Sequence, residues 1–262
     1  MANVRLAGGV SLRTGASGIG KQTALAFAEA AVDGILLADQ NEVTQATIDE
    51  CIKLAKNPNF RVVQVQTDVT DEANVANMVE TAVKESGRVN YCVHVAGMGG
   101  ISGARTEHLN VEVFDITLAV NARGIMLVLR AVSAAMDKQQ PLEHQSHRHR
   151  NSKRSLGRGS IVVIASINAT ISAQAIDNVK HHIRLNTLYP SWTDTAMMQA
   201  SLKRFPPLAK MIENVTPFRR AAMPEEVADV AVLLCSPAAS YVNGASLLVD
   251  AGMTLPAIRN SM

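Results

Sequence analysis

The sequence predicts an α/β fold in which a doubly wound parallel sheet carries helices on both faces. Its 262 residues suit one large α/β domain better than two small ones. Short apolar runs alternate with stretches of helical periodicity along the chain, which is typical of repeated βα units. A glycine-rich turn joins the first apolar run to the first helical stretch. We therefore expect a single domain over residues 1–262, with its ligand beyond the carboxyl ends of the strands.

The strands are predicted from short continuous apolar runs, because a parallel sheet is covered on both faces and buries both sides of each strand. The run that ends in the glycine-rich turn is the first, and the run over residues 161–166 is the most apolar. In chain order, the expected strands are residues 10–14, 35–38, 62–67, 91–95, 161–166, 183–189 and 245–249.

The helices are predicted from apolar residues spaced three and four apart and from signals at their ends. Asn57-Pro58 ends the second helix, and Thr70 or Asp71 caps the third. Pro224 opens the last helix, at a position where proline is tolerated. In chain order, the expected helices are residues 21–31, 43–56, a helix that ends at 85, 111–136, a flap over 196–209, and 224–235.

The glycine-rich turn has the sequence TGASGIG over residues 14–20. Glycines let the backbone approach a ligand closely, and the helix that follows directs free N–H groups and partial positive charge at the turn. Such a site suits a diphosphate. Asp39, at the end of the second strand, adds the acid that follows a dinucleotide-binding turn by about 20 residues. An ordinary tight turn is the alternative, and the sequence favours a Rossmann-like dinucleotide site.

The charge balance and the cysteines exclude several classes of protein. A net charge of +2 gives no reason to expect nucleic acid or an anionic membrane as a partner. Cys51, Cys92 and Cys235 lie far apart in apolar patterns, so we expect buried thiols in a reducing compartment and no metal site. The N-terminus has no signal-peptide core, and no apolar run approaches the roughly 20 residues that span a bilayer. We expect a soluble, cytoplasmic protein.

Residues 139–158 differ in composition from the rest of the chain. They contain five lysines and arginines, three histidines and a single acid, Glu143. A metal site would need further ligands at fixed spacing, and a nucleic-acid site would need aromatic residues. We therefore predict a solvated or disordered basic insertion.

Several motifs, all in the same order, resemble the short-chain dehydrogenase/reductase family over about residues 6–255. They are the glycine-rich turn, Asp39, Asp68-Val69, Ala96-Gly97, Asn121, the strand that ends at Ser166, the loop over residues 190–195, and the segment over residues 249–252.

The resemblance implies a nicotinamide dinucleotide as cofactor and a small alcohol or ketone as substrate. A carboxylate at Asp39 would accept a hydrogen bond from the ribose 2′-hydroxyl and repel a 2′-phosphate. Ser17 stands where NADP-dependent members often carry a base. NAD is therefore favoured, with NADP as the alternative. The cofactor-binding residues implied are Gly15, Ser17, Ile19, Gly20, Asp39, Asp68, Val69, Ala96, Gly97, Arg130, Lys180 and Thr195.

The resemblance assigns catalysis to Ser166, which would donate a hydrogen bond to the substrate carbonyl, and to Asn121, which would fix a water for proton relay. The family's tyrosine and lysine would fall at Val179 and Ile183, and no Tyr-x-x-x-Lys occurs in the chain. Only 16 residues separate Ser166 from Ile183, so we expect the fold to be shortened after its fifth strand by the loss of the helix that carries both groups.

Three nearby residues are candidates to replace what is lost. Lys180 is either a remnant lysine beside the nicotinamide ribose or an ordinary surface lysine. Asp177 and His181 are alternative acids that the sequence does not place.

Two further departures from the family lie at the turn. The turn has two residues, Ala16 and Ser17, where the family has three, which changes the direction of each N–H group. Arg13 replaces an apolar strand residue. Because burial of an unpaired guanidinium is costly, we expect Arg13 to reach solvent, an acid or a phosphate.

Three interpretations of function follow from these observations. The first is an NAD(P)-dependent oxidoreductase for an alcohol or ketone, with impaired proton transfer. The second is a non-catalytic nucleotide-binding or scaffolding protein, and the third is a chain from which a misplaced exon boundary removed one helix. The family assembles through the helices after strands four and five, so a weakened homo-oligomer is expected. The basic insertion is similar to that of members from fungal small-molecule biosynthesis, which suggests secondary metabolism.

Overall fold

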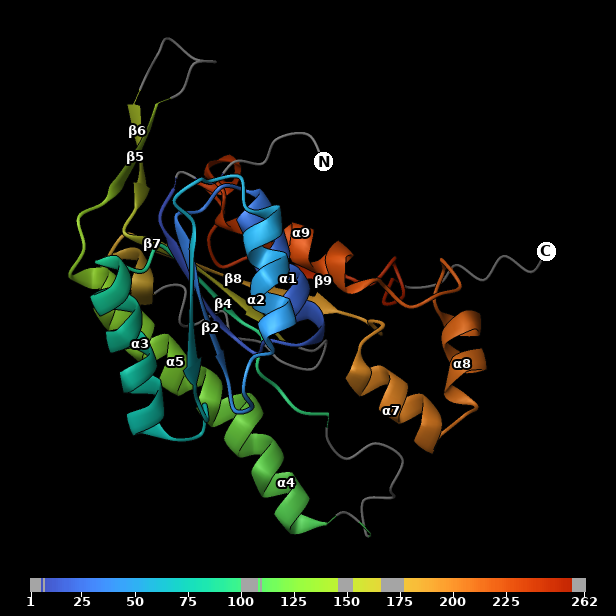
Figure 1. Ribbon diagram of the computed structural model, residues 1–262. Helices are drawn as coiled ribbons and strands as arrows, with labels where there is room; N and C mark the ends of the chain where they lie inside the picture. The colour runs from blue at the N-terminus through green and yellow to red at the C-terminus, as the bar shows by residue number, and fades with distance from the viewer. Residues whose placement is uncertain are drawn as a thin grey trace.

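A computed structural model describes residues 6, 8–99, 108, 110–145, 153–165 and 177–255. Its central sheet consists of β1 (Val10–Thr14), β2 (Gly34–Asp39), β3 (Arg61–Gln66), β4 (Tyr91–His94), β7 (Gly159–Ile164), β8 (Ile183–Pro190) and β9 (Ser246–Val249). All neighbouring strands are parallel, in the order β3-β2-β1-β4-β7-β8-β9 (Figure 1). From β1 the chain adds β2 and β3 toward one edge of the sheet. It then returns to place β4 on the other side of β1 and adds β7, β8 and β9 toward the second edge. This topology confirms the predicted doubly wound α/β fold.

Helices cover both faces of the sheet. One layer consists of α1 (Gly18–Glu29), α2 (Gln45–Leu54) and α9 (Pro224–Cys235), and the other contains α3 (Glu72–Ser86) and α5 (Ile125–Asp137) (Figure 1). Ile35 and Leu37 of β2 pack in the first layer's core, and Leu36 between them packs in the second. Because successive side chains of a strand point to opposite faces, a strand covered on both sides reads as one continuous apolar run.

The long helix expected over residues 111–136 is divided in the structure. It consists of α4 (Val111–Leu118), a π-helical turn η2 (Ala119–Gly124) and α5. The whole stretch, Val111–Asp137, has 27 residues, and an 18-residue window within it has a mean hydropathy of 1.4, which by length and composition alone is enough to cross a membrane. The expectation that no such run exists was therefore wrong. Core helices of soluble proteins also meet this criterion, and α5 packs against the sheet through Val128, Val132 and Met136.

The flap expected over residues 196–209 is a pair of helices, α7 (Ala196–Arg204) and α8 (Leu208–Val215). The sequence between them is Phe205-Pro206-Pro207. Proline lacks an N–H group and disfavours helical conformation in the preceding residue, so one continuous helix cannot form here.

The described part of the basic insertion is solvated, as predicted, but it contains regular structure, which corrects the alternative of a disordered segment. β5 (Leu142–Gln145) pairs antiparallel with β6 (Lys153–Gly157) in a two-stranded sheet that projects from the main body (Figure 1). Arg154 Nη2 donates to Pro237 O at 2.7 Å, in the short helix η3 (Pro237–Ala239). This contact ties the base of the hairpin to the globule. Residues 146–152, which connect the two strands in the sequence, lie outside the described residues.

Arg13 does not reach solvent, an acid or a phosphate, so that expectation was wrong. Its side chain is fully buried beneath α1, where the guanidinium carbon lies 3.7 Å from the centroid of the Phe27 ring. Nη2 donates to Ser11 Oγ at 2.9 Å, whereas Nε and Nη1 have no hydrogen-bond partner among the described residues. Burial lowers the pKa of Arg13 to about 9. A cation–π contact and one hydrogen bond thus replace the apolar packing expected at this position.

Candidate functional site

The glycine-rich turn connects β1 to α1 so closely that two of its glycines cannot be replaced. Gly15 has a φ of +82°, and a Cβ atom on Gly20 would lie 1.8 Å from Gly15 O. The first turn of α1 is held by Gly20 N, which donates to Ser17 O at 2.9 Å. The absent side chains leave open backbone at the amino end of the helix. This cradle fits the diphosphate group expected from the sequence.

Asp39 lies at the end of β2 with its carboxylate directed toward the turn. Oδ2 accepts from Ala16 N at 2.7 Å, and Oδ1 accepts from Asn41 N at 3.0 Å. The carboxylate therefore holds the N–H group of a turn that is one residue shorter than in the family. Each oxygen keeps a further lone pair for a ribose hydroxyl.

The loop after β4, which contains Ala96 and Gly97, is fixed to the turn by Thr14. Thr14 Oγ1 accepts from Val95 N at 3.2 Å and from Ala96 N at 3.3 Å. A Cβ atom on Gly15 would lie only 3.0 Å from Ala96 N, so the two loops touch through backbone. Thr14 thus sets the separation of the two loops that border the crevice.

His94 is a member of this cluster that the sequence did not single out as functional. It is fully buried in β4, and its Nδ1 lies 2.7 Å from Thr14 Oγ1. Because the Thr14 oxygen faces two N–H donors, its proton is available to Nδ1, which assigns the imidazole proton to Nε2. Burial lowers the pKa of His94 to about 4, so the ring is neutral at ordinary pH.

The stability of the protein is expected to fall between pH 6.5 and pH 4, because unfolded His94 binds a proton in this range while folded His94 does not. The difference between the pKa values of unfolded and folded His94 corresponds to about 3 kcal/mol of folding stability. This contribution is fully present above pH 6.5 and is lost at pH 4. Replacement of His94 by asparagine should flatten this part of the profile. Chemical unfolding at a series of pH values measures the dependence of stability on pH. The control is His108→Asn, at an exposed residue. Parallel profiles for His94→Asn and the wild type would contradict the assignment.

Asn121 lies in η2 and its side chain binds the loop after β4. Oδ1 accepts from Met98 N and Nδ2 donates to Met98 O, both at 2.9 Å. A Cβ atom on Gly97 would lie 3.3 Å from Oδ1. Oδ1 and Nδ2 each keep one further hydrogen-bonding position, so the amide that positions this loop can also bind a water for proton relay. π-Helical turns often occur at functional sites.

Thr195 is brought to the glycine-rich turn by the segment that follows β8. Its methyl carbon would lie 3.0 Å from a Cβ atom on Gly18, and its Oγ1 accepts from Met198 N at 3.3 Å to cap α7. Met197 Sδ would lie 3.2 Å from a Cβ on Gly99. The start of α7 therefore rests on both loops of the crevice.

Asp68 and Val69 follow β3, where the resemblance places an adenine contact. The Asp68 carboxylate accepts from Thr70 N at 2.8 Å and from Thr70 Oγ1 at 2.7 Å, and Val69 is buried against Gly124. Ser17 is exposed at the start of α1. The partly buried side chain of Ile19 packs against the core under α1, and its backbone N–H lies in the first turn of that helix.

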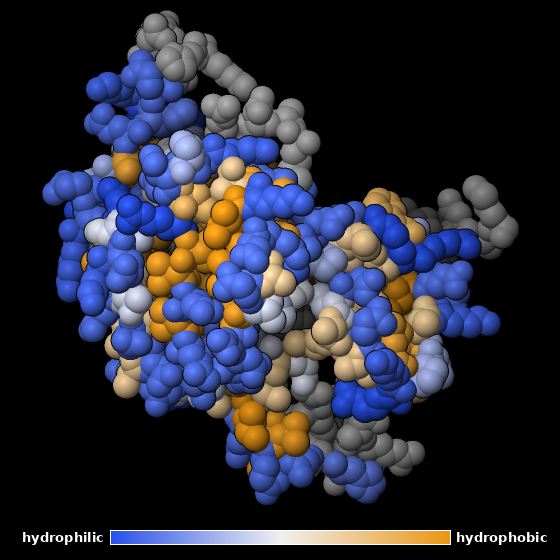
Figure 2. Space-filling view, in the orientation of Figure 1, coloured by the Kyte–Doolittle hydropathy of each residue, from blue (hydrophilic) through white to orange (hydrophobic). Residues whose placement is uncertain are grey.

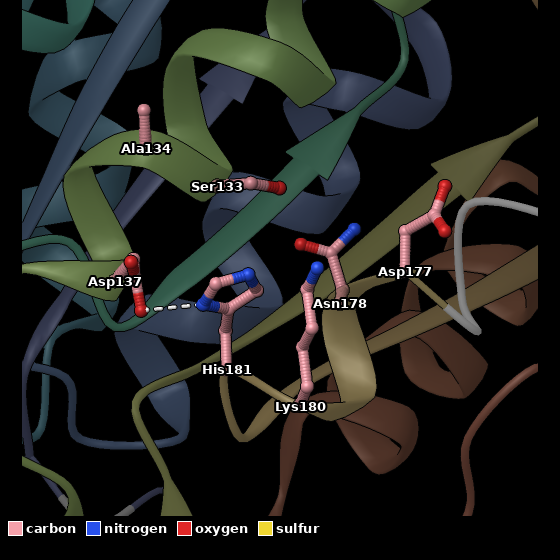
Figure 3. Close-up of a pocket in the computed structure, with 7 residues that line it drawn as sticks. All are labelled: Ser133, Ala134, Asp137, Asp177, Asn178, Lys180 and His181. Carbon is pink, nitrogen blue, oxygen red and sulfur yellow. Dashed lines mark hydrogen bonds and ion pairs between the residues drawn. The ribbon is translucent and has the colours of Figure 1, made fainter.

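Of the two remaining residues predicted to bind cofactor, Arg130 pairs with an acid of the neighbouring helix, and Lys180 lies at the other edge of the sheet. Arg130 is exposed on α5 and pairs with Glu72 at the start of α3. Lys180 precedes β8, and because β8 is parallel to β1, it lies at the amino edge of the sheet, opposite the glycine-rich turn. It lines a cavity of about 250 Å³ beside α5, together with His181 and Asp137, which are joined by a hydrogen bond between Nδ1 and Oδ1 at 2.8 Å (Figure 3). The prediction that Lys180 borders the nicotinamide ribose does not fit this position.

The position of this cavity also shows that the two predicted alternative acids lie away from the crevice. Asp177 and His181 line the cavity of Lys180 at the amino edge, away from the carboxyl end of β7. Ser166, the predicted catalytic serine, lies outside the described residues. The described segment that contains β7 ends at Ala165, and the next one begins at Asp177. The structure therefore brings together the turn, Asp39, the β4 loop, Asn121 and Thr195.

Comparisons with known proteins agree with this arrangement. A family profile described as enoyl-(acyl carrier protein) reductase matches residues 15–254. The chain is 38% identical over 264 residues to short-chain dehydrogenase fogB of Aspergillus ruber, across 93% of this chain and 96% of that protein. It is 36% identical over 263 residues to short-chain dehydrogenase srdC of Neurospora crassa, across 93% and 96% of the two chains.

Solved structures show the same architecture. Levodione reductase superposes with a TM-score of 0.82 at 27% identity, across 95% of this chain and 98% of that one. A 7α-hydroxysteroid dehydrogenase, solved with NADH and 7-oxo glycochenodeoxycholic acid, gives a TM-score of 0.77 at 27% identity, across 95% and 96%. The chain, with its dinucleotide crevice, belongs to the short-chain dehydrogenase/reductase family of oxidoreductases.

Proposed function

We propose that this protein is an NAD-dependent oxidoreductase that acts on the alcohol or ketone group of a small molecule. The observation that carries the proposal is the position of Asp39, whose carboxylate lies 2.7 Å from the backbone of the glycine-rich turn. An acid at this place accepts hydrogen bonds from both ribose hydroxyls of an adenosine and repels a 2′-phosphate, which favours NAD over NADP.

The residues that would hold the cofactor each have a separate task. The backbone of Gly18 to Gly20 would bind the diphosphate, and Asp39 would bind the ribose. Thr195, at the start of α7, would close over the nicotinamide end. When bound, NAD(H) supplies the hydride that is exchanged with the substrate carbon.

Proton transfer is the step for which the chain is least equipped. No Tyr-x-x-x-Lys is present, and loss of a positioned general acid typically costs a factor of 10² to 10⁴ in rate. Orientation of the two reactants is a separate contribution to rate. We therefore propose slow turnover with water as the proton donor. The missing pair also supports a second candidate function, a nucleotide-binding protein without turnover.

Removal of the Asp39 carboxylate tests the cofactor assignment. Asp39→Ala should weaken NADH binding at least about tenfold, because it removes charge-assisted hydrogen bonds worth roughly 1.5–3 kcal/mol. It should also raise the affinity for NADPH relative to NADH, because the repelling charge is gone. Fluorescence titration of the purified protein measures both, and Asp49→Asn on the exposed face of α2 is the control. Tighter binding of NADPH than of NADH by the wild type would contradict the proposal.

Turnover separates the two candidate functions. Oxidation of NADH is followed with a panel of small ketones and aldehydes, alongside a short-chain dehydrogenase that retains the Tyr-x-x-x-Lys motif. Slow turnover that depends on NADH binding supports the enzyme. Tight NADH binding with turnover at background supports the nucleotide-binding protein, and the absence of NADH binding contradicts both.

We also propose a weak homo-oligomer, in keeping with the expectation from the sequence. Apolar side chains of α4 are exposed at the lower end of the molecule (Figure 2). They are Val111, Val113, Phe114, Ile116 and Leu118, with exposed fractions of 40–65%. Contact between two copies would remove them from water. Light scattering should show dissociation at low concentration, and Phe114→Glu should favour the monomer. A monomer at all concentrations would contradict this proposal.

A further inference from the structure

The corner between α7 and α8 projects away from the sheet (Figure 1). It consists of residues 203–211, with the sequence KRFPPLAKM, and joins the end of α7 to the first half of α8. The two prolines end one helix before the other begins, so the chain turns here and the corner protrudes from the surface. We call residues 203–211 the flap corner.

The flap corner carries three cations that no neighbouring acid compensates. Lys203 and Arg204 end α7, Lys210 lies in the first turn of α8, and all three side chains are exposed. None of the three forms an ion pair within the part of the chain that the structure describes. The sequence contains no aspartate or glutamate over residues 195–212. The net charge of +2 for the whole chain conceals this local excess, because acids elsewhere balance most of the cations.

Apolar side chains are exposed among these cations. Phe205, which follows Arg204, is 53% exposed, and Met211, which follows Lys210, is 42% exposed. Strongly hydrophilic and apolar patches accordingly adjoin each other over α7 and α8 (Figure 2). Cations next to exposed apolar side chains are typical of protein segments that lie in the interface of a membrane.

Other partners fit the flap corner less well than a lipid surface does. Contact between the flap corners of two copies would bring like charges together, which opposes self-association at this place. A folded acidic protein would need a groove of matching shape, whereas lipid headgroups adapt to a protruding surface. An anionic lipid surface attracts each nearby lysine or arginine, and the layer beneath its headgroups takes up apolar side chains. It therefore satisfies both the charge and the exposed apolar groups.

We propose that the flap corner docks on an anionic lipid surface. Lys203, Arg204 and Lys210 contact the lipid headgroups, and Phe205 and Met211 enter the boundary between the headgroups and the acyl chains. The start of α7 rests on the loops of the crevice, and its nine residues place the flap corner roughly 13 Å away. No residue of the cofactor site takes part, so docking does not require NADH.

Sedimentation of the full chain with lipid vesicles tests the proposal. Vesicles of equimolar phosphatidylcholine and phosphatidylserine should bind at least about tenfold more tightly than vesicles of phosphatidylcholine alone, and added salt should weaken the binding. Lys203→Gln combined with Arg204→Gln should weaken binding to the anionic vesicles at least about tenfold, because each cation contributes a factor of about five. Phe205→Ser should weaken it about fivefold through loss of the inserted ring.

The matched control is Lys53→Gln combined with Lys56→Gln. It removes the same charge from two exposed lysines at the end of α2, and it should bind the anionic vesicles as the wild type does. Equal binding by the wild type and by the Lys203→Gln, Arg204→Gln variant with native circular dichroism would overturn the proposal.

Three further outcomes are decisive. Equal affinity for the two kinds of vesicle, or no sedimentation with the anionic vesicles, would overturn the proposal. Retention on polyglutamate without binding to vesicles would identify an acidic protein as the partner and would also overturn it. A chain that binds anionic vesicles in the expected way but does not bind NADH would contradict the proposed function alone.

Discussion

Replacement of Arg13 by leucine is expected to raise the free energy of unfolding by about 3 kcal/mol. The guanidinium is fully buried, makes one side-chain hydrogen bond and has no carboxylate beside it. The fall of its pKa from 12.5 to about 9 corresponds to a penalty of roughly 5 kcal/mol for the charged form. Loss of the contact with Phe27 and imperfect filling of the volume offset part of the gain. Denaturant unfolding measures the change.

Arg184→Leu is the matched comparison, and the opposite sign is expected. Arg184 is also buried, but its guanidinium donates to the carbonyl oxygens of Leu234 at 2.8 Å, Val242 at 3.1 Å and Cys235 at 3.4 Å. Its removal takes a charged donor away from three buried carbonyl oxygens, of which Leu234 O and Val242 O keep weaker neutral donors in Ser160 and Asn186, and should cost about 3 kcal/mol. Two buried arginines are thus predicted to differ in sign because one has partners and the other has almost none. Destabilisation by both substitutions would contradict this account of Arg13.

Gly20→Ala is expected to have the largest effect on the nucleotide crevice. The new Cβ atom would lie 1.8 Å from Gly15 O, so α1 must move away from the turn. We expect a loss of at least about 3 kcal/mol in the free energy of unfolding, in the range of strongly destabilising core substitutions. NADH binding should fall at least about 100-fold because the N–H groups of the helix start no longer converge. Thermal unfolding and NADH titration measure the two effects separately.

Ser17→Ala is the control within the same turn. Ser17 precedes α1, but its side chain makes no capping hydrogen bond, so its loss should change neither stability nor fold. If Gly20→Ala unfolded at the same temperature as Ser17→Ala, the close contact between α1 and the turn would not exist in solution.

The outcomes at Asp39 and Lys180 show where sequence reasoning holds and where it fails. Asp39 is the last residue of β2, and the end of a parallel strand next to β1 is necessarily close to the turn after β1. Lys180 was interpreted either as a remnant lysine beside the nicotinamide ribose or as a surface lysine at the entry to the next strand, and its exposed position before β8 fits the second interpretation. Sequence alone did not choose between the two, because the choice depends on which edge of the sheet the residue occupies. Arg130 pairs with Glu72 of α3, a contact between two helices that their separate sequence patterns do not show.

The secondary structure of the basic insertion was not predicted, because its amino-acid composition gave no sign of strands. A segment rich in charge is usually solvated, and this one is, but two of its stretches pair as β5 and β6. Backbone pairing of short polar strands leaves little trace in hydrophobic periodicity. The hydrogen bond from Arg154 to Pro237 O joins residues that are far apart in the chain, so no local sequence pattern predicts it.

The sequence by itself determined the parallel α/β architecture, the glycine-rich turn and the acid that faces it, because these depend on local periodicity and on residues adjacent to strand ends. It also determined that no Tyr-x-x-x-Lys exists. Only the tertiary structure decided that Arg13 is buried beside Phe27, that His94 and Thr14 join the two crevice loops, and that Lys180 lies at the far edge. These features are contacts between distant segments, and their geometry exists only once the sheet has brought the strands together.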